Sequence, residues 1–326
     1  MAVYTRLGAE EMASIIEAFD VGTLTSAKGI AEGVSNSNWL IETQGADGAA
    51  RRFILTMYET RTDIADLPFF LDLLDHLAAR HCPVPRTIHD REGSSHRFHK
   101  GKALALIEFL PGVSVSEPTA GQARAVGAAL AQVHLASQDF PALRDNSLGL
   151  GAWKQLLSAC GREGLESIHP ELGGIVEHEL KVLFAHWPSN LPRGVIHADL
   201  FPDNVLMLGD KVTGLIDFYF ACTDIIAYDI AVTHAAWCFN ADGSRFLPEL
   251  STALLEGYES VRHLAPEERS ALPLLARGAA MRFLATRAYD WMNTPADALV
   301  TPKDPLAFAR RLEFYADSGN AEVFAA

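Results

Sequence analysis

The chain is poor in cysteine, and its cysteines follow no pattern typical of a metal site or a disulfide framework. Only four are present among 326 residues, and no two form a C-x-x-C pair: Cys82, Cys160, Cys222 and Cys238. Zinc sites and disulfide frameworks are recognised by characteristic cysteine spacings, so neither is expected. We expect reduced thiols, as in a cytoplasmic protein.

Long hydrophobic runs are also lacking. No segment approaches the run of about 18 uncharged apolar residues that suggests a membrane-spanning helix. The first residues lead directly into a helix-like apolar pattern that includes Ile15, Ile16 and Phe19. They lack the cationic region, apolar stretch and cleavage site of a secretory signal. We therefore expect no membrane association and a cytoplasmic location.

Positive charge is scarce, with 27 Lys and Arg against 41 Asp and Glu, which gives a formal net charge of −14. General nucleic-acid binding depends on many Lys and Arg side chains that neutralise phosphates, so we expect no nucleic-acid partner. A single nucleotide remains compatible with this charge, because Mg²⁺ and a few local N–H groups are enough to hold it. The same charge favours a cationic or zwitterionic substrate over a polyanion.

The apolar patterns divide the chain into two unequal parts. Residues 1–110 read as strands with one helix between them, and residues 111–326 read as mostly helical, with the boundary at Pro111-Gly112. The first part has expected strands at residues 23–30, 38–43, 53–57 and 104–110, and a helix at residues 67–80. In the second part, Thr119 and Gln122 have the spacing of a capping box. Further helices are expected at residues 171–187, 229–239, 248–258 and 266–291.

The most informative motif begins at His197 and ends with a second acidic residue after a separate apolar run. Asp199 and Asn204 stand five residues apart, and Asp217 precedes Phe218, which makes H-x-D-x-x-x-x-N followed by D-F. This arrangement is typical of kinases. Asp199 is the predicted catalytic carboxylate beside the acceptor hydroxyl. Asn204 and Asp217 are the predicted Mg²⁺ ligands, because Mg²⁺ prefers hard oxygen atoms and takes further ligands from phosphates and water.

A simple turn is the alternative for this motif, since Asp, Pro and Asn all favour turns. Turn chemistry requires neither a His at the start nor a second Asp after another strand, so the kinase interpretation is preferred. For His197 we expect a structural role in holding the loop and no chemistry. A loop with Gly33, Ser35 and Asn36 lies between the first two strands and is a candidate cover for phosphates, because small residues let N–H groups approach an anion. Taken alone, such a loop is more often an ordinary hairpin turn, and only its position ahead of the catalytic motif favours the phosphate role.

Taken together, these motifs resemble the aminoglycoside phosphotransferase and choline kinase superfamily. Within it, the chain is most similar to the bacterial homoserine kinases of this fold. The resemblance covers nearly the whole chain, and the segments that carry it are residues 28–38, 66–71, 197–205 and 214–229.

The resemblance implies an α+β, bilobal, protein-kinase-like fold: a small antiparallel β-sheet lobe with one helix that binds nucleotide, and a larger mainly helical lobe that carries catalysis and substrate binding. It also implies that ATP, with Mg²⁺, phosphorylates the γ-hydroxyl of L-homoserine, a step of threonine synthesis. Backbone atoms near Glu108 and Leu110 would hold the adenine, with Leu206 and Ile216 as apolar neighbours.

One departure from the family concerns the third strand. Many kinases of this fold carry a Lys there that contacts the ATP phosphates, and the matching residue of this chain is Thr56. Either a nearby Arg51, Arg52 or Arg61 substitutes, or Mg²⁺ and backbone groups suffice.

Homoserine carries an ammonium and a carboxylate, so its pocket needs an acid and a cation that binds carboxylates. The candidate cations are Arg282 and Arg287, which lie about 140° apart on a helix, so only one is expected to face a given pocket fully. The candidate acids are Asp224 and Asp229, although Asp229 is also a candidate helix cap. The arginines are alternatively surface charges.

Other acceptors remain open. A choline or ethanolamine kinase would share the catalytic residues and have an aromatic cage, whereas an aminoglycoside kinase would have an acidic pocket without a carboxylate-binding Arg. A nucleotide-binding module without catalysis is the third alternative. The oligomeric state is not predicted.

Overall fold

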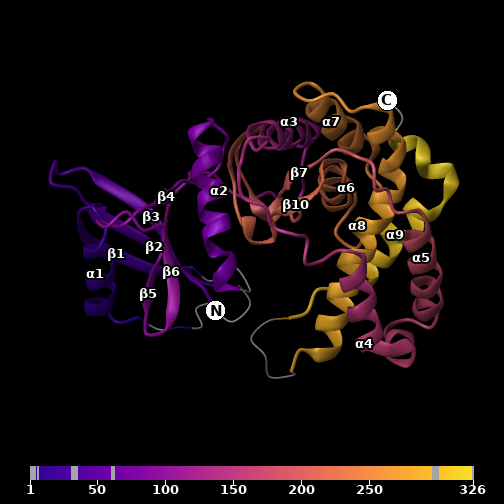
Figure 1. Ribbon diagram of the computed structural model, residues 1–326, viewed down its shortest axis with the longest axis horizontal. Coiled ribbons are helices and arrows are strands. Elements are labelled where there is room, and N and C mark those ends of the chain that lie inside the picture. Colours follow the sequence, from indigo (N-terminus) through magenta and orange to yellow (C-terminus); the bar gives the residue numbers. More distant parts are fainter. Residues whose placement is uncertain (1–4, 6, 31–35, 60–62, 296–300, 325–326) are drawn as a thin grey trace. The chain divides into compact units, whose positions relative to one another are not determined.

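In the computed structural model, which describes residues 5, 7–30, 36–59, 63–295 and 301–324, the chain divides after Pro111 into two units (Figure 1). The first unit is Met1–Pro111 and the second is Gly112–Ala326. The predicted loop residues Gly33 and Ser35 lie outside the described residues. Each unit has its own core, and each is described by itself below.

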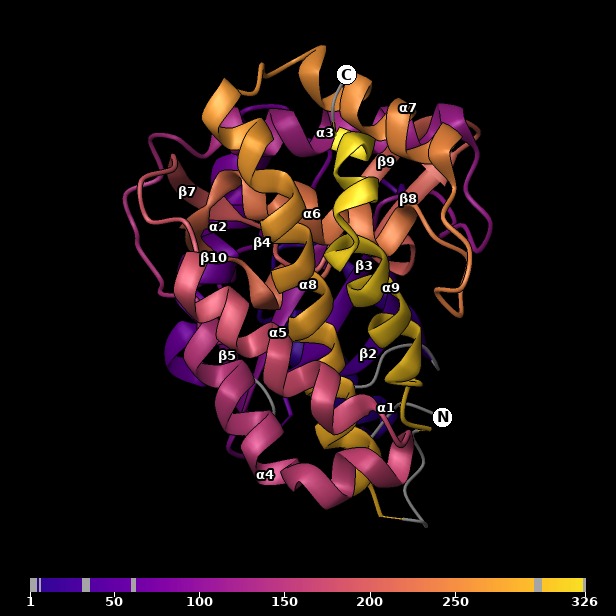
Figure 2. The ribbon, with the colours of Figure 1, turned by 90° about the vertical axis from the view of Figure 1, so that its right-hand side faces the viewer.

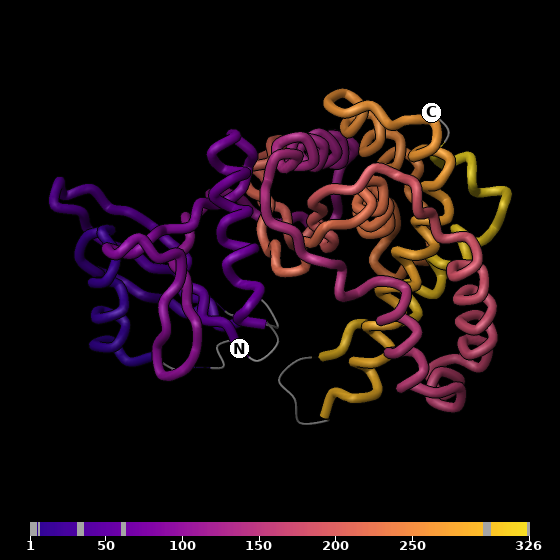
Figure 3. Tube along the Cα trace, viewed as in Figure 1, coloured from indigo at the N-terminus to yellow at the C-terminus, as the bar shows by residue number. Residues whose placement is uncertain are grey.

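The first unit is built on one antiparallel sheet. Among the described residues its strand order is β1-β2-β3-β6-β4, with β5 paired to β6 (Figure 3 follows the β5–β6 hairpin). Buried and less buried residues alternate along β2, as expected for a strand with one face on a core. The strands are β1 (Thr23–Ile30), β2 (Ser37–Gln44), β3 (Ala50–Met57), β4 (Thr87–Ile88), β5 (Arg97–His99) and β6 (Lys102–Glu108).

Two α-helices belong to this unit. Helix α1 (Ala9–Glu17) buries Ile15 and Ile16 in a core that includes Trp39 and Leu55 of the sheet. Helix α2 (Leu67–Ala79) follows the 3₁₀ turn η1 (Ile64–Asp66) and is the helix predicted between the strands.

The second unit is mainly helical, and its short strands form two-stranded pairs, β10 with β7 and β8 with β9. Its helices are α3 (Ala120–Ala136), α4 (Leu150–Ile168), α5 (Leu172–His186), α6 (Ile226–Trp237), α7 (Pro248–Glu259), α8 (Pro266–Asn293) and α9 (Leu306–Ala316). Its strands are β7 (Arg193–Ile196), β8 (Val205–Leu208), β9 (Lys211–Leu215) and β10 (Cys222–Ile225). The 3₁₀ turns are η2 (Pro202–Asn204), η3 (Phe218–Phe220) and η4 (Ser318–Phe324).

Helix α6 is the centre of the second unit, because all of its residues are buried. It packs against β7, β10 and the long helix α8, and Figure 2 shows α8 between α5 and α9. A helix that is apolar all round belongs in a core. The elements that carry the predicted motif therefore surround the most buried helix of the unit.

The predicted start of α6 is wrong by three residues. We expected the helix to begin at Asp229, but it begins at Ile226, and its N-cap residue Ile225 makes no side-chain cap. Asp229 therefore lies inside the first turn and is not the cap. The predicted capping box of α3 is confirmed: Gln122 N donates to Thr119 Oγ1 at 3.2 Å, and Thr119 N donates to Gln122 Oε1 at 3.0 Å.

Helix α9 and strands β7 and β10 were not predicted. Each strand has only four residues, too few for a clear alternation. The N-terminus of α9 is marked by Asp304, whose Oδ1 accepts from Leu306 N at 2.8 Å. None of the helices in the described part of the chain is both long and apolar enough to cross a membrane.

Helices α3 and α7 approach each other closely through glycines. A Cβ on Gly127 would clash with the carbonyl oxygen of Leu254, and a Cβ on Gly257 would clash with the carbonyl oxygen of Arg124. These neighbours are backbone atoms, which cannot move aside as a flexible side chain does. The two glycines therefore set the separation of the helices.

We expect Gly127→Ala to lower the free energy of unfolding by about 2–3 kcal/mol, because overpacking forces the two helices apart. The matched control is Gly174→Ala in α5, where no atom lies within 4 Å of an added Cβ. There the higher helix propensity of Ala should leave stability unchanged or raise it by about 1 kcal/mol. Urea unfolding of both variants measures the difference, and equal stabilities would contradict the close-packing account.

Candidate active site

The predicted catalytic loop follows β7 and is held by the ring of His197. Asp199 N donates to His197 Nδ1 at 3.2 Å, and His197 Nε2 lies 3.0 Å from the carbonyl oxygen of Ile216. The Nε2 atom must therefore carry the proton, and the ring is neutral. Burial lowers the pKa of His197, which keeps it neutral. The ring thus connects the loop to the segment that carries Asp217.

The backbone of the same loop is bound by Asp229. Its Oδ2 accepts from His197 N at 2.6 Å, and its Oδ1 accepts from Ala198 N at 2.7 Å. Ala198 has φ 64°, a left-handed conformation that is unfavourable for a residue with a Cβ. Asp229 is completely buried. The carboxylate therefore stabilises a strained backbone immediately before Asp199.

Asp229 begins a buried chain of polar contacts that crosses the unit. Its Oδ2 lies 3.1 Å from His134 Nε2, and His134 Nδ1 lies 2.8 Å from the hydroxyl of Tyr258. Arg262 donates to that hydroxyl at 3.2 Å and to Glu268 at 2.8 Å. Burial alone would raise the pKa of Asp229, but the hydrogen bonds and charge of His134, with the loop amides, lower it. His134 was not among the predicted residues, because it lies 95 positions from Asp229.

The two predicted metal ligands are brought together by a short backbone contact. Ile216 N donates to the carbonyl oxygen of Asn204 at 3.0 Å, and Asp217 follows with a left-handed φ of 66°. Asn204 Nδ2 donates to the carbonyl oxygen of Asp199 at 2.7 Å and to its Oδ2 at 3.2 Å. The amide nitrogen is thus engaged by the loop, and the amide oxygen is left as an acceptor.

This donor set fits Mg²⁺. One carboxylate and one amide oxygen are hard ligands, and Mg²⁺ usually completes its shell with water and substrate phosphates. In the described ranges, no group of three or more His, Cys, Asp and Glu side chains forms a closed metal cage. The residues therefore suit a cation that arrives with phosphate, and do not suit a structural metal.

The acidic side chains of the site have raised pKa values. Burial raises the pKa of Asp199 to about 7, against the opposing charge of Arg282. Removal from water and, after it, the Asp203 charge raise the pKa of Asp217 to about 6, but Asp217 is an exposed residue, so contact with solvent reduces this shift. Both groups thus resist carrying a negative charge while no cation is bound.

Arg282 is buried behind the loop. Its Nη1 donates to the carbonyl oxygen of Ala198, and its Nη2 lies 3.9 Å from Asp199 Oδ1. The guanidinium lies over two aromatic rings, 5.4 Å from the Phe220 centroid and 4.6 Å from that of Phe283. Arg282 therefore supports Asp199 from the protein side.

Arg287 lies one and a half turns further along α8. It donates to the carbonyl oxygen of Asp304 at 3.1 Å and lies 4.5 Å from the centroid of Phe308. Burial and the neighbouring Arg311 lower its pKa to about 10, while the charges of Asp199 and other carboxylates oppose this shift. Of the two predicted arginines, Arg282 thus contacts the catalytic loop, whereas Arg287 contacts Asp304 and Phe308.

Asp224 lies on β10 and is already paired. Its Oδ1 lies 3.1 Å from Arg193, and its Oδ2 accepts from Asn146 at 2.8 Å. Neither this carboxylate nor that of Asp229 is therefore left without partners. Leu206 and Ile216, the predicted apolar neighbours of adenine, are half-buried residues of the second unit.

The predicted nucleotide residues of the first unit lie at strand ends. Asn36 is buried, and its Oδ1 accepts from Glu59 N at 3.3 Å. Glu108 ends β6, where its N donates to the carbonyl oxygen of Arg86 at 2.9 Å. Leu110 follows in a half-buried position.

Thr56, the residue at the position where a Lys was expected, donates from Oγ1 to Asn38 Oδ1 at 2.8 Å. The suggested substitutes are paired with acids: Arg51 with Asp47 at 3.2 Å and Arg52 with Glu42 at 3.0 Å. Arg61 lies outside the described residues. The cation expected at this strand is thus not supplied by either arginine that the structure describes.

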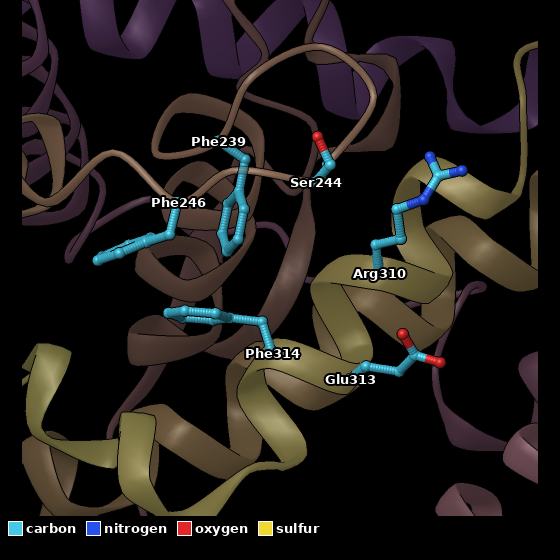
Figure 4. A pocket seen from close by; sticks show the side chains of 7 residues that line it. Phe239, Ser244, Phe246, Arg310, Glu313 and Phe314 are labelled. Atoms are coloured by element: carbon cyan, nitrogen blue, oxygen red, sulfur yellow. The ribbon is translucent and has the colours of Figure 1, made fainter.

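A hollow of about 320 Å³ lies elsewhere, between the segment after α6 and helix α9. Figure 4 shows that the ends of the Arg310 and Glu313 side chains point away from the rings of Phe239 and Phe314. The hollow shares no residue with the catalytic loop, so it is not the site described above.

Comparison with known proteins agrees with this geometry. The sequence profile described as "Phosphotransferase enzyme family" matches residues 26–264. A homoserine kinase from Azorhizobium caulinodans is 50% identical over 315 residues, which cover 97% of this chain and 96% of that protein. A homoserine kinase from Acidiphilium cryptum is 50% identical over 321 residues, with 98% of each chain covered.

A solved structure supports the fold. An amicoumacin kinase in complex with AMP-PNP, Ca²⁺ and its antibiotic superposes with a TM-score of 0.68, and the match covers 96% of this chain and 94% of that one. At 15% identity the likeness concerns the fold alone. The predicted α+β kinase-like fold, with an antiparallel sheet in one part and helices in the other, is confirmed.

We expect Asp229→Asn to lower the free energy of unfolding by about 3 kcal/mol, because two loop amides and His134 lose a charged acceptor inside the protein. The control is Asp224→Asn, whose partner Arg193 is half exposed, so a loss of about 1 kcal/mol or less is expected. Urea unfolding at pH 7 measures both.

The stability lost in Asp229→Asn should depend on pH, because the pKa of Asp229 is lowered in the folded protein. The folded-state pKa of Asp229 is lowered, so its contribution is present above the unfolded pKa of about 4 and is lost as the pH falls through the folded value. The difference in free energy of unfolding between the wild type and Asp229→Asn should therefore become smaller as the pH falls. A difference in free energy of unfolding that stays constant from pH 7 to pH 3 would contradict the charged state of Asp229.

Proposed function

The chain belongs to the phosphotransferase enzyme family and, within it, to the homoserine kinases, and we propose that it transfers the γ-phosphoryl group of ATP to the hydroxyl of L-homoserine. The product is O-phospho-L-homoserine, an intermediate of threonine biosynthesis. The observation that carries this proposal is the pairing of the loop with Asp199 and Asn204 to the segment with Asp217, through the bond from Ile216 N to the carbonyl oxygen of Asn204. We place the reaction in the cytoplasm, where buried, unpaired thiols such as the four of this chain stay reduced.

In the proposed reaction the oxygen of the homoserine hydroxyl forms a bond to the γ-phosphorus, and the bond between that phosphorus and ADP breaks. Asp199 accepts the hydroxyl proton, a role that suits a carboxyl whose pKa lies near 7. Arg282 and Asn204 hold Asp199 in place. Asn204 and Asp217 would hold Mg²⁺, which when bound neutralises charge on the phosphate oxygens.

Arg287 is the better candidate for the carboxylate of homoserine. Arg282 is engaged by the loop and enclosed by two rings, whereas Arg287 is half-buried and has a lowered pKa. A guanidinium that is partly removed from water gains from an anionic ligand. Asp224 and Asp229 are both paired within the protein, so we assign them to the positioning of their partners and not to the binding of the homoserine ammonium.

The aromatic rings near the loop favour homoserine over choline. Rings of Phe220 and Phe283 already face Arg282, and the ring of Phe308 faces Arg287. A cage for a quaternary ammonium requires ring faces without a resident cation. Asn36, the loop before it and the end of β6 remain the predicted contacts of the nucleotide.

The direct test is ATP consumption by the purified protein with Mg²⁺ and one acceptor at a time: homoserine, choline, ethanolamine, hydroxylysine or kanamycin. Mass spectrometry identifies the phosphorylated product. We expect phosphohomoserine as the main product. Turnover of a different acceptor would keep the catalytic loop and overturn the assigned acceptor.

Substitution of the loop carboxylates separates their roles. Asp199→Ala should lower kcat about 10³-fold and leave ATP affinity largely unchanged, whereas Asp217→Ala should also weaken Mg·ATP binding. Asp210→Asn, an exposed carboxylate in the β8–β9 turn, is the control and should retain wild-type rates. Near-normal turnover by Asp199→Ala would overturn its role.

The pH dependence follows from the raised carboxyl pKa values. Protonated Asp199 cannot accept a proton, so kcat/KM should fall as the pH drops, with an apparent inflection between about 6 and 7. At saturating Mg·ATP the inflection of kcat should move to lower pH, because a bound cation favours the carboxylates. A flat profile from pH 8 to pH 5.5 would contradict this account.

A further inference from the structure

The catalytic loop and the segment after β9 together carry several acidic side chains. Asp199, Asp203 and Asp217 lie on or next to the loop, and ATP would add further negative charge. Thr56 supplies no cation, and Arg51 and Arg52 stand five and four residues before it on β3, about 13–17 Å away along the strand. Lys102, at the start of β6, is held by Glu59 at 2.5 Å. Phosphoryl transfer depends on positive groups near the transferring oxygens.

The catalytic unit supplies a cation that the sequence motifs did not indicate. Lys303 lies just before α9, and its Nζ is 3.5 Å from Asp203 Oδ2. The same Nζ lies 5.7 Å from the centroid of the Phe201 ring. Phe201 and Asp203 both belong to the catalytic loop, between Asp199 and Asn204. A segment from the end of the chain thus brings a positive charge to the centre of the motif.

The backbone next to Lys303 is held by hydrogen bonds of Asp304, whereas the side chain of Lys303 is exposed. Asp304 caps α9 through Leu306 N, and its carbonyl oxygen accepts from Arg287. The side chain of Lys303 is 62% exposed, and that of Asp203 is 63% exposed. An exposed ion pair of this kind contributes little to stability. Exchange of Asp203 for a phosphate oxygen therefore has a low cost.

Lys303 contacts Asp203, the residue directly before the predicted metal ligand Asn204. Its charge acts on both Asp199 and Asp217 and favours their ionised forms. The carboxylates that act on Arg287 are instead Asp304, Asp199 and Asp203. The γ-phosphoryl group must pass between the catalytic carboxylate and the metal ligand, so the cation near both of these groups is the one suited to contact it.

We propose that Lys303 contacts the transferring γ-phosphoryl group and supplies a cation that Thr56 cannot supply. On nucleotide binding its ammonium leaves Asp203 and donates to a γ-phosphate oxygen. Arg287, which donates to the carbonyl oxygen of Asp304, remains for the acceptor carboxylate. The inference rests on the proposed kinase function, although it does not depend on which acceptor is phosphorylated.

The variant Lys303→Met removes the charge and keeps an unbranched apolar stem, and Lys303→Arg restores a cation. The matched control is Lys154→Met, because Lys154 is also an exposed lysine, 5.8 Å from the ring centroid of Phe184, away from the loop. The first measurement is the affinity for Mg·AMP-PNP and for Mg·ADP by calorimetry, without acceptor.

We expect Lys303→Met to bind Mg·AMP-PNP about 10-fold more weakly and Mg·ADP almost as well as the wild type, since only the former has a γ-phosphate. Its kcat should fall about 10²-fold, with the KM for homoserine changed less than about threefold. Lys303→Arg should recover much of both losses. Lys154→Met should match the wild type in every measurement.

A raised KM for homoserine with unchanged nucleotide affinity would overturn the proposal, because it would assign Lys303 to the acceptor carboxylate. An equal loss of affinity for Mg·AMP-PNP and Mg·ADP, or no change in any measured parameter, would overturn the proposal as well. The nucleotide measurement uses no acceptor. Absence of homoserine turnover by the wild type would therefore overturn the proposed substrate without affecting this test.

Discussion

The site depends on one buried carboxylate. Asp229 lies on the helix at the centre of the second unit and binds two consecutive amides of the catalytic loop. These bonds hold Ala198 in a left-handed conformation, and that conformation turns the chain so that Asp199 follows it. Because Asp229 is itself bound by His134, its charge is compensated inside the protein. The catalytic loop is thus attached to the core of the unit.

The cationic side chains around this loop differ in their exposure to solvent. Arg282 supports Asp199 from the buried side and lies between aromatic rings, where it has lost much of its contact with water. Arg287 and Lys303 lie closer to solvent, and each faces a ring. Ring faces favour cations without neutralising them, so these two side chains keep their charge for anionic ligands. This arrangement fits a zwitterionic acceptor and a polyphosphate donor, in a protein whose net charge is strongly negative.

Local patterns predicted a large part of this structure. The capping box at Thr119, the apolar spacing of α2 and the alternation of β2 each involve a few neighbouring residues, and the structure bears them out. The catalytic motif was visible because its spacing is set by one short loop and two strands. The contacts of Asp229 with His134, and of Lys303 with the loop, were not predictable in this way, because they join residues about 100 positions apart. Asp229 looked like a helix cap or a ligand, since sequence alone does not show that α6 begins three residues earlier.

The account holds that the loop fixed by Asp229 directs the γ-phosphoryl group to the hydroxyl of an amino acid and away from water. Phosphorus-31 NMR of the purified protein with Mg·ATP and L-homoserine tests this most directly, because it distinguishes a phosphomonoester from inorganic phosphate in the same spectrum. The account predicts a phosphomonoester signal, coupled to the γ-methylene protons of homoserine, in an amount equal to the ADP formed. ADP accompanied by inorganic phosphate, or no ADP at all, would contradict it.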